Sequence, residues 1–238
     1  MMDDLRHNQA VLRELMAHHI HREGNFPWFY RDNQPEGWVT IGVGCLVKKK
    51  DDARKLPTIP GVTFYTVHNT IASPDDIVED WERVHNHPLG HPKLGADGYE
   101  SVAKLRLKEG GVFALYRHKI EQMANLLYKR RPFIMYYDAR VAASFIDVLY
   151  NPAGVRLFDD DRPDIYEMWM YLNPLHPKFD PYQGWWIFRK IWISRGGPNR
   201  TRYAERHEQR ASMLYRGIAR TPPPGGYRLH LSSPYLRS

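Results

Sequence analysis

Three residues near the start of the chain have side chains and spacing suited to acid–base chemistry. Glu23 is followed directly by glycine, Asp32 lies two residues after Tyr30, and Thr40 opens the segment TIGVG. A partly buried carboxyl group can stay protonated while a wetter carboxylate nearby stays ionised. Hydrolysis of a glycosidic bond uses such a pair, because one acid protonates the leaving oxygen and the other orients water or stabilises positive charge. Each residue also has a simpler interpretation, since Glu23 could be a surface acid at a helix end and Asp32 a turn former.

The surrounding elements determine whether these side chains can meet. The spacing of apolar residues over 3–22 predicts an amphipathic helix. Asp3 or Asp4 could cap its start, and Gly24 is placed to stop it. Two β-type runs on either side of the turn-rich segment 32–37 predict a hairpin with a long loop. A carboxyl group at the helix end would then face a hairpin that carries a second carboxylate and a hydroxyl group.

The rest of the chain predicts an α+β fold that is mostly α. A short strand is possible over 62–67, and the nearly continuous apolar run over 139–150 predicts the most buried helix. We expect one catalytic domain over 1–220, with an insertion at about 47–105, and an irregular tail over 221–238. The predicted helices beyond the first one span 74–84, 109–130, 139–150, 163–172, 182–194 and 200–216. Ser73, Asp138 and Asn199 are placed to cap three of them, and the segment 151–154 ends the helix over 139–150. The arginines of the last helix could form a face for nucleic acid or one that is solvated or faces the cell wall; they are Arg200, Arg202, Arg206, Arg210 and Arg216.

Composition excludes several classes of protein. A single cysteine, Cys45, rules out an intramolecular disulfide, and no apolar run is long enough for a membrane span. The excess of Lys and Arg over Asp and Glu, 34 − 27 = 7, suits a polyanionic partner such as nucleic acid, anionic lipid or a cell-wall polymer, or simply keeps the protein soluble. The histidines at 85, 87 and 91 have ligand-like spacing, but the prolines and glycine among them indicate a loop rather than a defined scaffold, which favours surface histidines over a metal site. The aspartates over 159–161 lack the spaced ligands of a calcium loop, so we expect no metal.

The motif residues occur in an order that resembles a known family. The segment 21–46, HREGNFPWFYRDNQPEGWVTIGVGCL, resembles the active-site motif of the phage-type lysozymes. The spacing from Glu23 to Asp32 matches that family, and the spacing from Asp32 to Thr40 is longer, which a longer hairpin turn would absorb. The segments 141–154 and 197–215 resemble the family's buried central helix and its C-terminal Pro-Asn-Arg helix. The chain departs from the family at Cys45, where the family commonly has histidine.

This resemblance implies a two-lobed, lysozyme-like fold with a small N-terminal β-hairpin region and a helical C-terminal lobe. It implies that Glu23 is the general acid, that Asp32 is the second carboxylate and that the Thr40 hydroxyl helps to hold the attacking water. Arg200 would pair with Glu23, and Tyr30 would pack in the hairpin. The implied activity is that of a peptidoglycan muramidase, which cleaves the β-1,4 bond between N-acetylmuramic acid and N-acetylglucosamine with inversion and without a cofactor.

The sequence leaves the biological setting and two rival functions open. The first residues lack the pattern of a secretory signal, so we expect synthesis in the cytoplasm and action in the periplasm or on the cell wall. A phage endolysin would be released through a holin lesion. An antibacterial effector would be injected, for example by a type VI secretion apparatus, and could have an immunity protein as a partner. The rivals are a non-catalytic module that binds wall glycans and a basic protein that binds nucleic acid; the lysozyme resemblance favours glycan strands and no nucleic acid as the partner.

Overall fold

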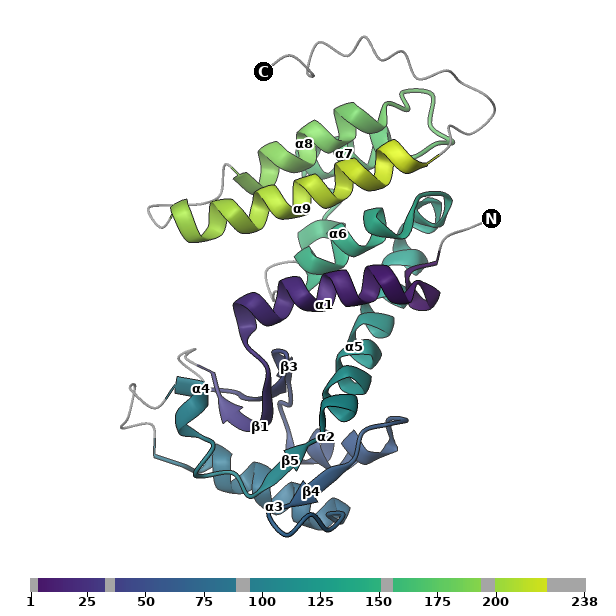
Figure 1. The fold of residues 1–238 in the computed structure, drawn as a ribbon. Coiled ribbons are helices and arrows are strands. Elements are labelled where there is room, and N and C mark those ends of the chain that lie inside the picture. The colour runs from purple at the N-terminus through teal and green to yellow at the C-terminus, as the bar shows by residue number, and fades with distance from the viewer. Residues whose placement is uncertain (1–3, 33–36, 89–94, 151–155, 194–199, 222–238) are drawn as a thin grey trace. The chain divides into compact units, whose positions relative to one another are not determined.

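The computed structural model describes residues 4–32, 37–88, 95–150, 156–193 and 200–221, with side chains described except at 192, 193 and 200–204. The described part is mostly helical with a small antiparallel sheet, which confirms the α+β class (Figure 1). Predictions that lie outside the described residues are the hairpin turn at 33–36, the helix stop over 151–154, the cap at Asn199 and the tail beyond 221.

The chain forms two compact units, which we call the β-unit and the helical unit. The β-unit is Glu14–Glu121, and the helical unit combines Met1–Arg13 with Gln122–Ser238. The predicted insertion at 47–105 therefore lies wholly within the β-unit.

A three-stranded antiparallel sheet in the β-unit has the strand order β1-β2-β3. Strands β1 (Phe26–Arg31) and β2 (Val39–Gly42) form the predicted hairpin. Strand β3 (Cys45–Leu46) was not predicted. It follows a tight turn in which Gly42 and Gly44 both have positive φ, a backbone conformation that glycine adopts at little cost.

A second hairpin pairs β4 (Phe64–Thr66) with β5 (Leu105–Leu107). The buried ring of Phe64 stacks on that of Phe29 from β1, with ring centroids 5.5 Å apart, so the hairpin packs on the sheet. The remaining elements of the β-unit are α2 (Lys50–Lys55), the 3-10 helix η2 (Leu56–Thr58), α3 (Pro74–His85) and α4 (Gly95–Gly98).

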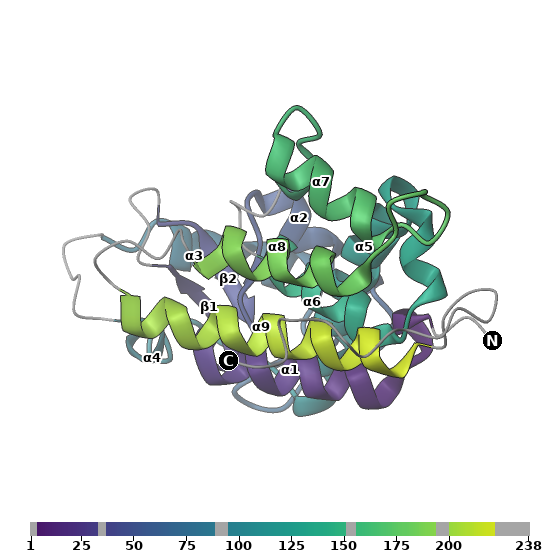
Figure 2. The same cartoon turned by 90° about the horizontal axis from the view of Figure 1, so that it is seen from above.

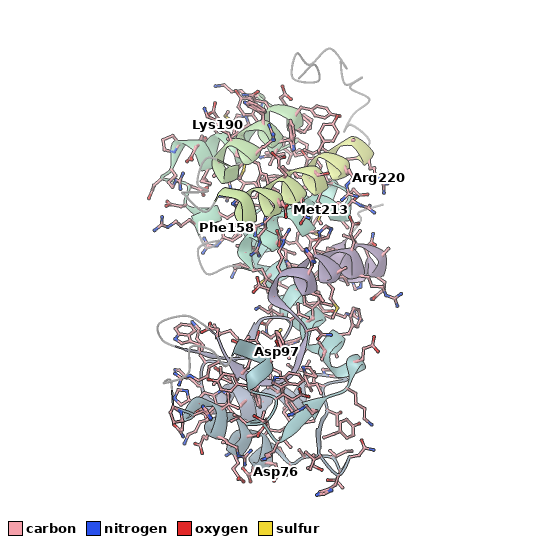
Figure 3. All side chains as sticks on the ribbon, turned by 60° about the vertical axis from the view of Figure 1, so that its left-hand side comes forward. Asp76, Asp97, Phe158, Lys190, Met213 and Arg220 are labelled. Carbon is pink, nitrogen blue, oxygen red and sulfur yellow. The ribbon has the colours of Figure 1, made fainter. Side chains whose placement is uncertain are left out.

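Helix α3 is fixed at its start and in its middle by aspartates. Ser73 and Asp76 form a reciprocal capping box, as the sequence Ser-Pro-Asp-Asp predicts (Asp76 is labelled in Figure 3). The buried carboxylate of Asp80 accepts the backbone N–H groups of Lys104 and Leu105 at 2.7 and 3.1 Å, which attaches the start of β5 to α3. Burial raises the pKa of Asp80, and these hydrogen bonds and the nearby Arg83 oppose that shift.

The first helix begins later than the sequence predicted. Asp4 caps only the 3-10 helix η1 (Leu5–His7), and α1 (Gln9–Glu23) starts after Asn8, whose side chain accepts the backbone N–H of Val11 at 3.1 Å. The prediction of one helix from residue 3 was wrong because two successive side-chain caps divide the segment. Helix α5 (Glu109–Arg130) has the predicted bounds, and both α1 and α5 have residues in each unit.

The helical unit is built around α6 (Ala139–Leu149), which Figures 1 and 2 show with α7 (Pro163–Leu172), α8 (Pro181–Ile193) and α9 (Arg200–Arg220). Asp138 caps α6 as predicted, and its side chain accepts the N–H of Arg140. Every residue of α6 except Arg140 is buried, which confirms the prediction for this segment. The 3-10 helix η3 (Pro132–Tyr136) precedes α6.

Two arginines of helix α9 do not lie on the solvated face that was predicted for them. Arg206 and Arg210 both form ion pairs with Asp147 of α6, and the side chains of Arg210 and Asp147 are each only 4% exposed. The carboxylate in the mostly apolar α6 attracts the two guanidinium groups, because a buried charge needs a partner. Met213, labelled in Figure 3, is buried on the same helix. These two arginines therefore pair within the helical unit and do not form a surface for nucleic acid.

None of the helices in the described ranges combines the length and apolar character that crossing a membrane requires.

Candidate active site

The end of α1 fixes the position of Glu23. Gly24 has a φ of +76°, and a Cβ at this position would overlap the ring of Phe26, so both the backbone and the available space require glycine. The Gly24 N–H donates to the Ile20 carbonyl at 2.9 Å and closes the last helical turn. The Glu-Gly pair thus places a partly buried carboxyl group where the chain leaves the helix and enters β1.

The hairpin positions Tyr30, Asp32 and Thr40 close together. Tyr30 and Thr40 are directly opposite in the β1–β2 ladder. Asp32 closes the hairpin through two contacts with Trp38: its N–H donates to the Trp38 carbonyl, and its Oδ1 accepts the Trp38 N–H, both at 3.0 Å. Asp32 therefore does have the turn-forming role that was its simpler interpretation, and only one of its carboxylate oxygens makes this contact.

Thr40 lies in the middle of the sheet. It is 5% exposed, its strand neighbours are Tyr30 on one side and Leu46 on the other, and its hydroxyl lies 3.4 Å from the carbonyl of Trp38. The hydroxyl group is thus held by the same hairpin that holds Asp32.

Both candidate carboxylates affect the ionisation of the Tyr30 phenol. Burial raises the pKa of the Tyr30 phenol strongly, and the charges of Glu23, Cys45 and Asp32 raise it further. Glu23 from α1 and Asp32 from the hairpin therefore both act on one buried phenol. The Tyr30 hydroxyl group therefore stays neutral. The Tyr30 ring packs edge-on against that of Phe26, with ring centroids 5.1 Å apart.

A residue that the sequence analysis did not single out reaches the same place from α5. The ammonium group of Lys119 donates to the Gly44 carbonyl at 2.8 Å, within the turn that joins β2 to β3. Burial lowers the pKa of Lys119, while Cys45 and Glu23 act in the opposite direction. The signal that could have found it is its position in the apolar stripe of the 109–130 helix, where Lys119 lies between Tyr116 and Met123.

A second polar contact joins α5 to α1. His19 is fully buried, and its Nδ1 is hydrogen-bonded to the Tyr116 hydroxyl at 2.9 Å. His19 precedes Glu23 by four residues on α1, so the two lie on the same side of the helix one turn apart. The sequence predicted His19 as a member of the inward stripe, and the structure adds its partner.

The structure describes the side chain of Cys45 but not that of Arg200. Cys45 is buried in β3, where it pairs with Ile41. Arg200 begins α9, but its side chain lies outside the described residues, so its pairing with Glu23 stays a prediction.

Comparison of the chain with protein-family models, with curated proteins and with solved structures found no significant match. The resemblance to phage-type lysozymes thus depends on the motif residues and their spacing in the sequence.

Proposed function

We propose that this protein is a peptidoglycan muramidase that hydrolyses the β-1,4 bond between N-acetylmuramic acid and N-acetylglucosamine. The observation that carries the proposal is that Glu23 ends α1 just before β1, while the β1–β2 hairpin holds Asp32 and Thr40. Both carboxylates also raise the pKa of the buried Tyr30 phenol in that hairpin. Glycoside hydrolysis requires two carboxyl groups on either side of the scissile bond.

In the proposed mechanism Glu23 donates a proton to the glycosidic oxygen as the bond breaks. Asp32 and Thr40, held by the same hairpin, bind a water molecule on the opposite face of the sugar and direct it at the anomeric carbon. Asp32 accepts a proton from that water. Glu23 thus loses one proton and Asp32 gains one, so the total charge of the two carboxyl groups does not change. No cofactor takes part in these steps, because the proton transfers need only the two carboxyl groups and water.

Two biological settings fit this activity, a phage endolysin and an injected antibacterial effector that has an immunity protein. In either one the enzyme acts on glycan strands outside the cytoplasm. The burial of Arg206 and Arg210 against Asp147 removes two of the basic groups on which the rival nucleic-acid function depended.

Purified sacculi provide the direct test of the bond that is cleaved. We expect mass spectrometry of the soluble digest to show disaccharide-peptides with hydrated N-acetylmuramic acid at the reducing end. N-acetylglucosamine at the reducing end would identify a different glycosidase. Anhydro products, lighter by one water, would show that no water is added. If binding to sacculi occurs without release of fragments, the protein is a binding module and the proposal fails.

The stereochemistry of the first product tests the roles of Asp32 and Thr40. If they hold a water molecule, the substrate's β-linkage should give an α-anomer first, which proton NMR at short reaction times can detect before mutarotation. A β-anomer, or a glycosyl group attached to Asp32 in an intact-mass spectrum, would instead make Asp32 the nucleophile.

A further inference from the structure

One face of α5 makes polar contacts with both segments that carry the candidate catalytic residues. Tyr116 and Lys119 are three residues apart and therefore neighbours on the helix surface. Tyr116 is hydrogen-bonded to His19, one helical turn before Glu23, at 2.9 Å. Lys119 is hydrogen-bonded to the Gly44 carbonyl, four residues after Thr40, at 2.8 Å. Through these two contacts α5 fixes both the helix end and the sheet turn of the site.

Using an ammonium group for the contact with the Gly44 carbonyl is unfavourable in free energy. Lys119 occupies an otherwise apolar stripe, and taking an ammonium ion out of water is unfavourable unless other groups compensate. Burial accordingly lowers the pKa of Lys119. A neutral donor could satisfy one carbonyl oxygen without that cost, so the hydrogen bond alone does not account for a cation here.

The charges around Lys119 suggest what the cation does. Glu23 from α1 and Cys45 from β3 are the groups whose negative forms stabilise the ammonium ion. Glu23 is in turn near Tyr30 from β1, which also faces Asp32 and Cys45. Lys119 therefore brings a positive charge from α5 into the surroundings of Glu23.

We propose that Lys119 is a positioning residue of the active site, which anchors the β2–β3 turn through Gly44 and supplies a fixed positive charge beside Glu23. The inference rests on the proposed function, in which Glu23 is the general acid. A fixed cation attracts a nearby carboxylate and so restricts the orientation of its side chain. Lys119 therefore acts on the positioning of Glu23 and of the turn that follows Thr40.

Three substitutions separate the two parts of this role. Lys119→Met removes both the hydrogen bond and the charge, Lys119→Gln keeps a donor without the charge, and Lys119→Arg keeps both. We expect Lys119→Met to lower the peak rate of sacculus lysis by about tenfold or more, since small errors in positioning can cost ~10²-fold. We expect both neutral variants to lower kcat more than they raise KM for soluble glycan fragments, because substrate binding does not depend on the orientation of Glu23, and Lys119→Arg to restore kcat.

The matched control is Lys50→Met, which removes a solvent-exposed ammonium group of the same unit that pairs with Glu82 at 3.7 Å. We expect this variant to keep the wild-type kcat and KM. Thermal unfolding of all variants shows which of them fold, and Lys119→Gln serves if Lys119→Met does not. If the folded neutral variants keep the wild-type kcat and KM, the proposal is overturned.

Hydrogen exchange of the backbone amides of the β2–β3 turn distinguishes this inference from the proposed function. We expect faster exchange in Lys119→Met than in wild-type protein, because the hydrogen bond to the Gly44 carbonyl is lost. Faster exchange in a protein that does not lyse sacculi would reject the muramidase proposal while supporting the anchoring role of Lys119. Equal exchange in an active enzyme would reject the inference alone.

Discussion

Replacing Glu23 with glutamine is expected to abolish lysis of sacculi while leaving the fold intact. Glutamine has nearly the same size and can occupy the same partly buried position at the end of α1, but it cannot donate a proton to the leaving oxygen. Loss of a general acid typically lowers the rate by ~10²–10⁴-fold. The rate of turbidity loss with purified sacculi measures this effect, and circular dichroism verifies the fold.

Glu100→Gln is the matched control for this substitution. Glu100 is an exposed residue of the same unit, and its hydrogen bonds to Arg106 and Asp97 use its backbone carbonyl and N–H rather than its side chain. We expect this variant to lyse sacculi at the wild-type rate. A folded Glu23→Gln protein with near wild-type activity would exclude Glu23 as the general acid and would remove the main support for the proposed mechanism.

Truncating Phe145 to alanine is expected to cost about 3–5 kcal/mol in the free energy of unfolding of the helical unit, because it leaves a cavity in a fully buried site. Phe145 is completely buried in α6, between the rings of Trp169 from α7 and Phe188 from α8, whose centroids lie 4.5 and 5.3 Å away. These two rings cannot close the gap without moving the helices that carry them. A lower midpoint in urea, monitored by tryptophan fluorescence, would show the loss.

Tyr166→Ala is the control for the truncation, because it also removes an aromatic ring from this unit but from a side chain that is 55% exposed. Surface substitutions of this kind usually change stability by less than ~0.5 kcal/mol. A cost below ~1 kcal/mol for Phe145→Ala would mean that α6 is not the centre of the core. That result would contradict the correspondence with the buried central helix of the phage-type lysozymes.

Local patterns in the sequence were sufficient where a single segment determines its own structure. The spacing of apolar residues, together with proline, glycine and capping residues, predicted the bounds of α3, α5, α6 and α7 to within about one residue. The burial predicted for Ala142, Phe145, Ile146 and Leu149 is also confirmed, since none is more than 8% exposed. The same reasoning predicted a hairpin that carries Asp32 and Thr40 and a glycine that ends the helix at Glu23.

Short strands could not be predicted in this way. Strand β5 has only three residues, too few to show a period, and it exists because β4 pairs with it and Asp80 binds the backbone that leads into it. The start of α1 was misplaced for a related reason, because Asp4 and Asn8 both have capping side chains and the sequence does not say which one begins the longer helix.

The charged residues show most clearly what the sequence determined and what only the tertiary structure decided. The sequence by itself determined that Glu23 and Asp32 belong to adjoining elements, because a helix, a glycine and a hairpin follow one another without interruption. Lys119 comes to this site from far along the chain, and Arg210 becomes buried because α6 brings Asp147 to it. A lysine or arginine has the same local pattern whether it faces water or a buried carboxylate, so only long-range packing decides between the two.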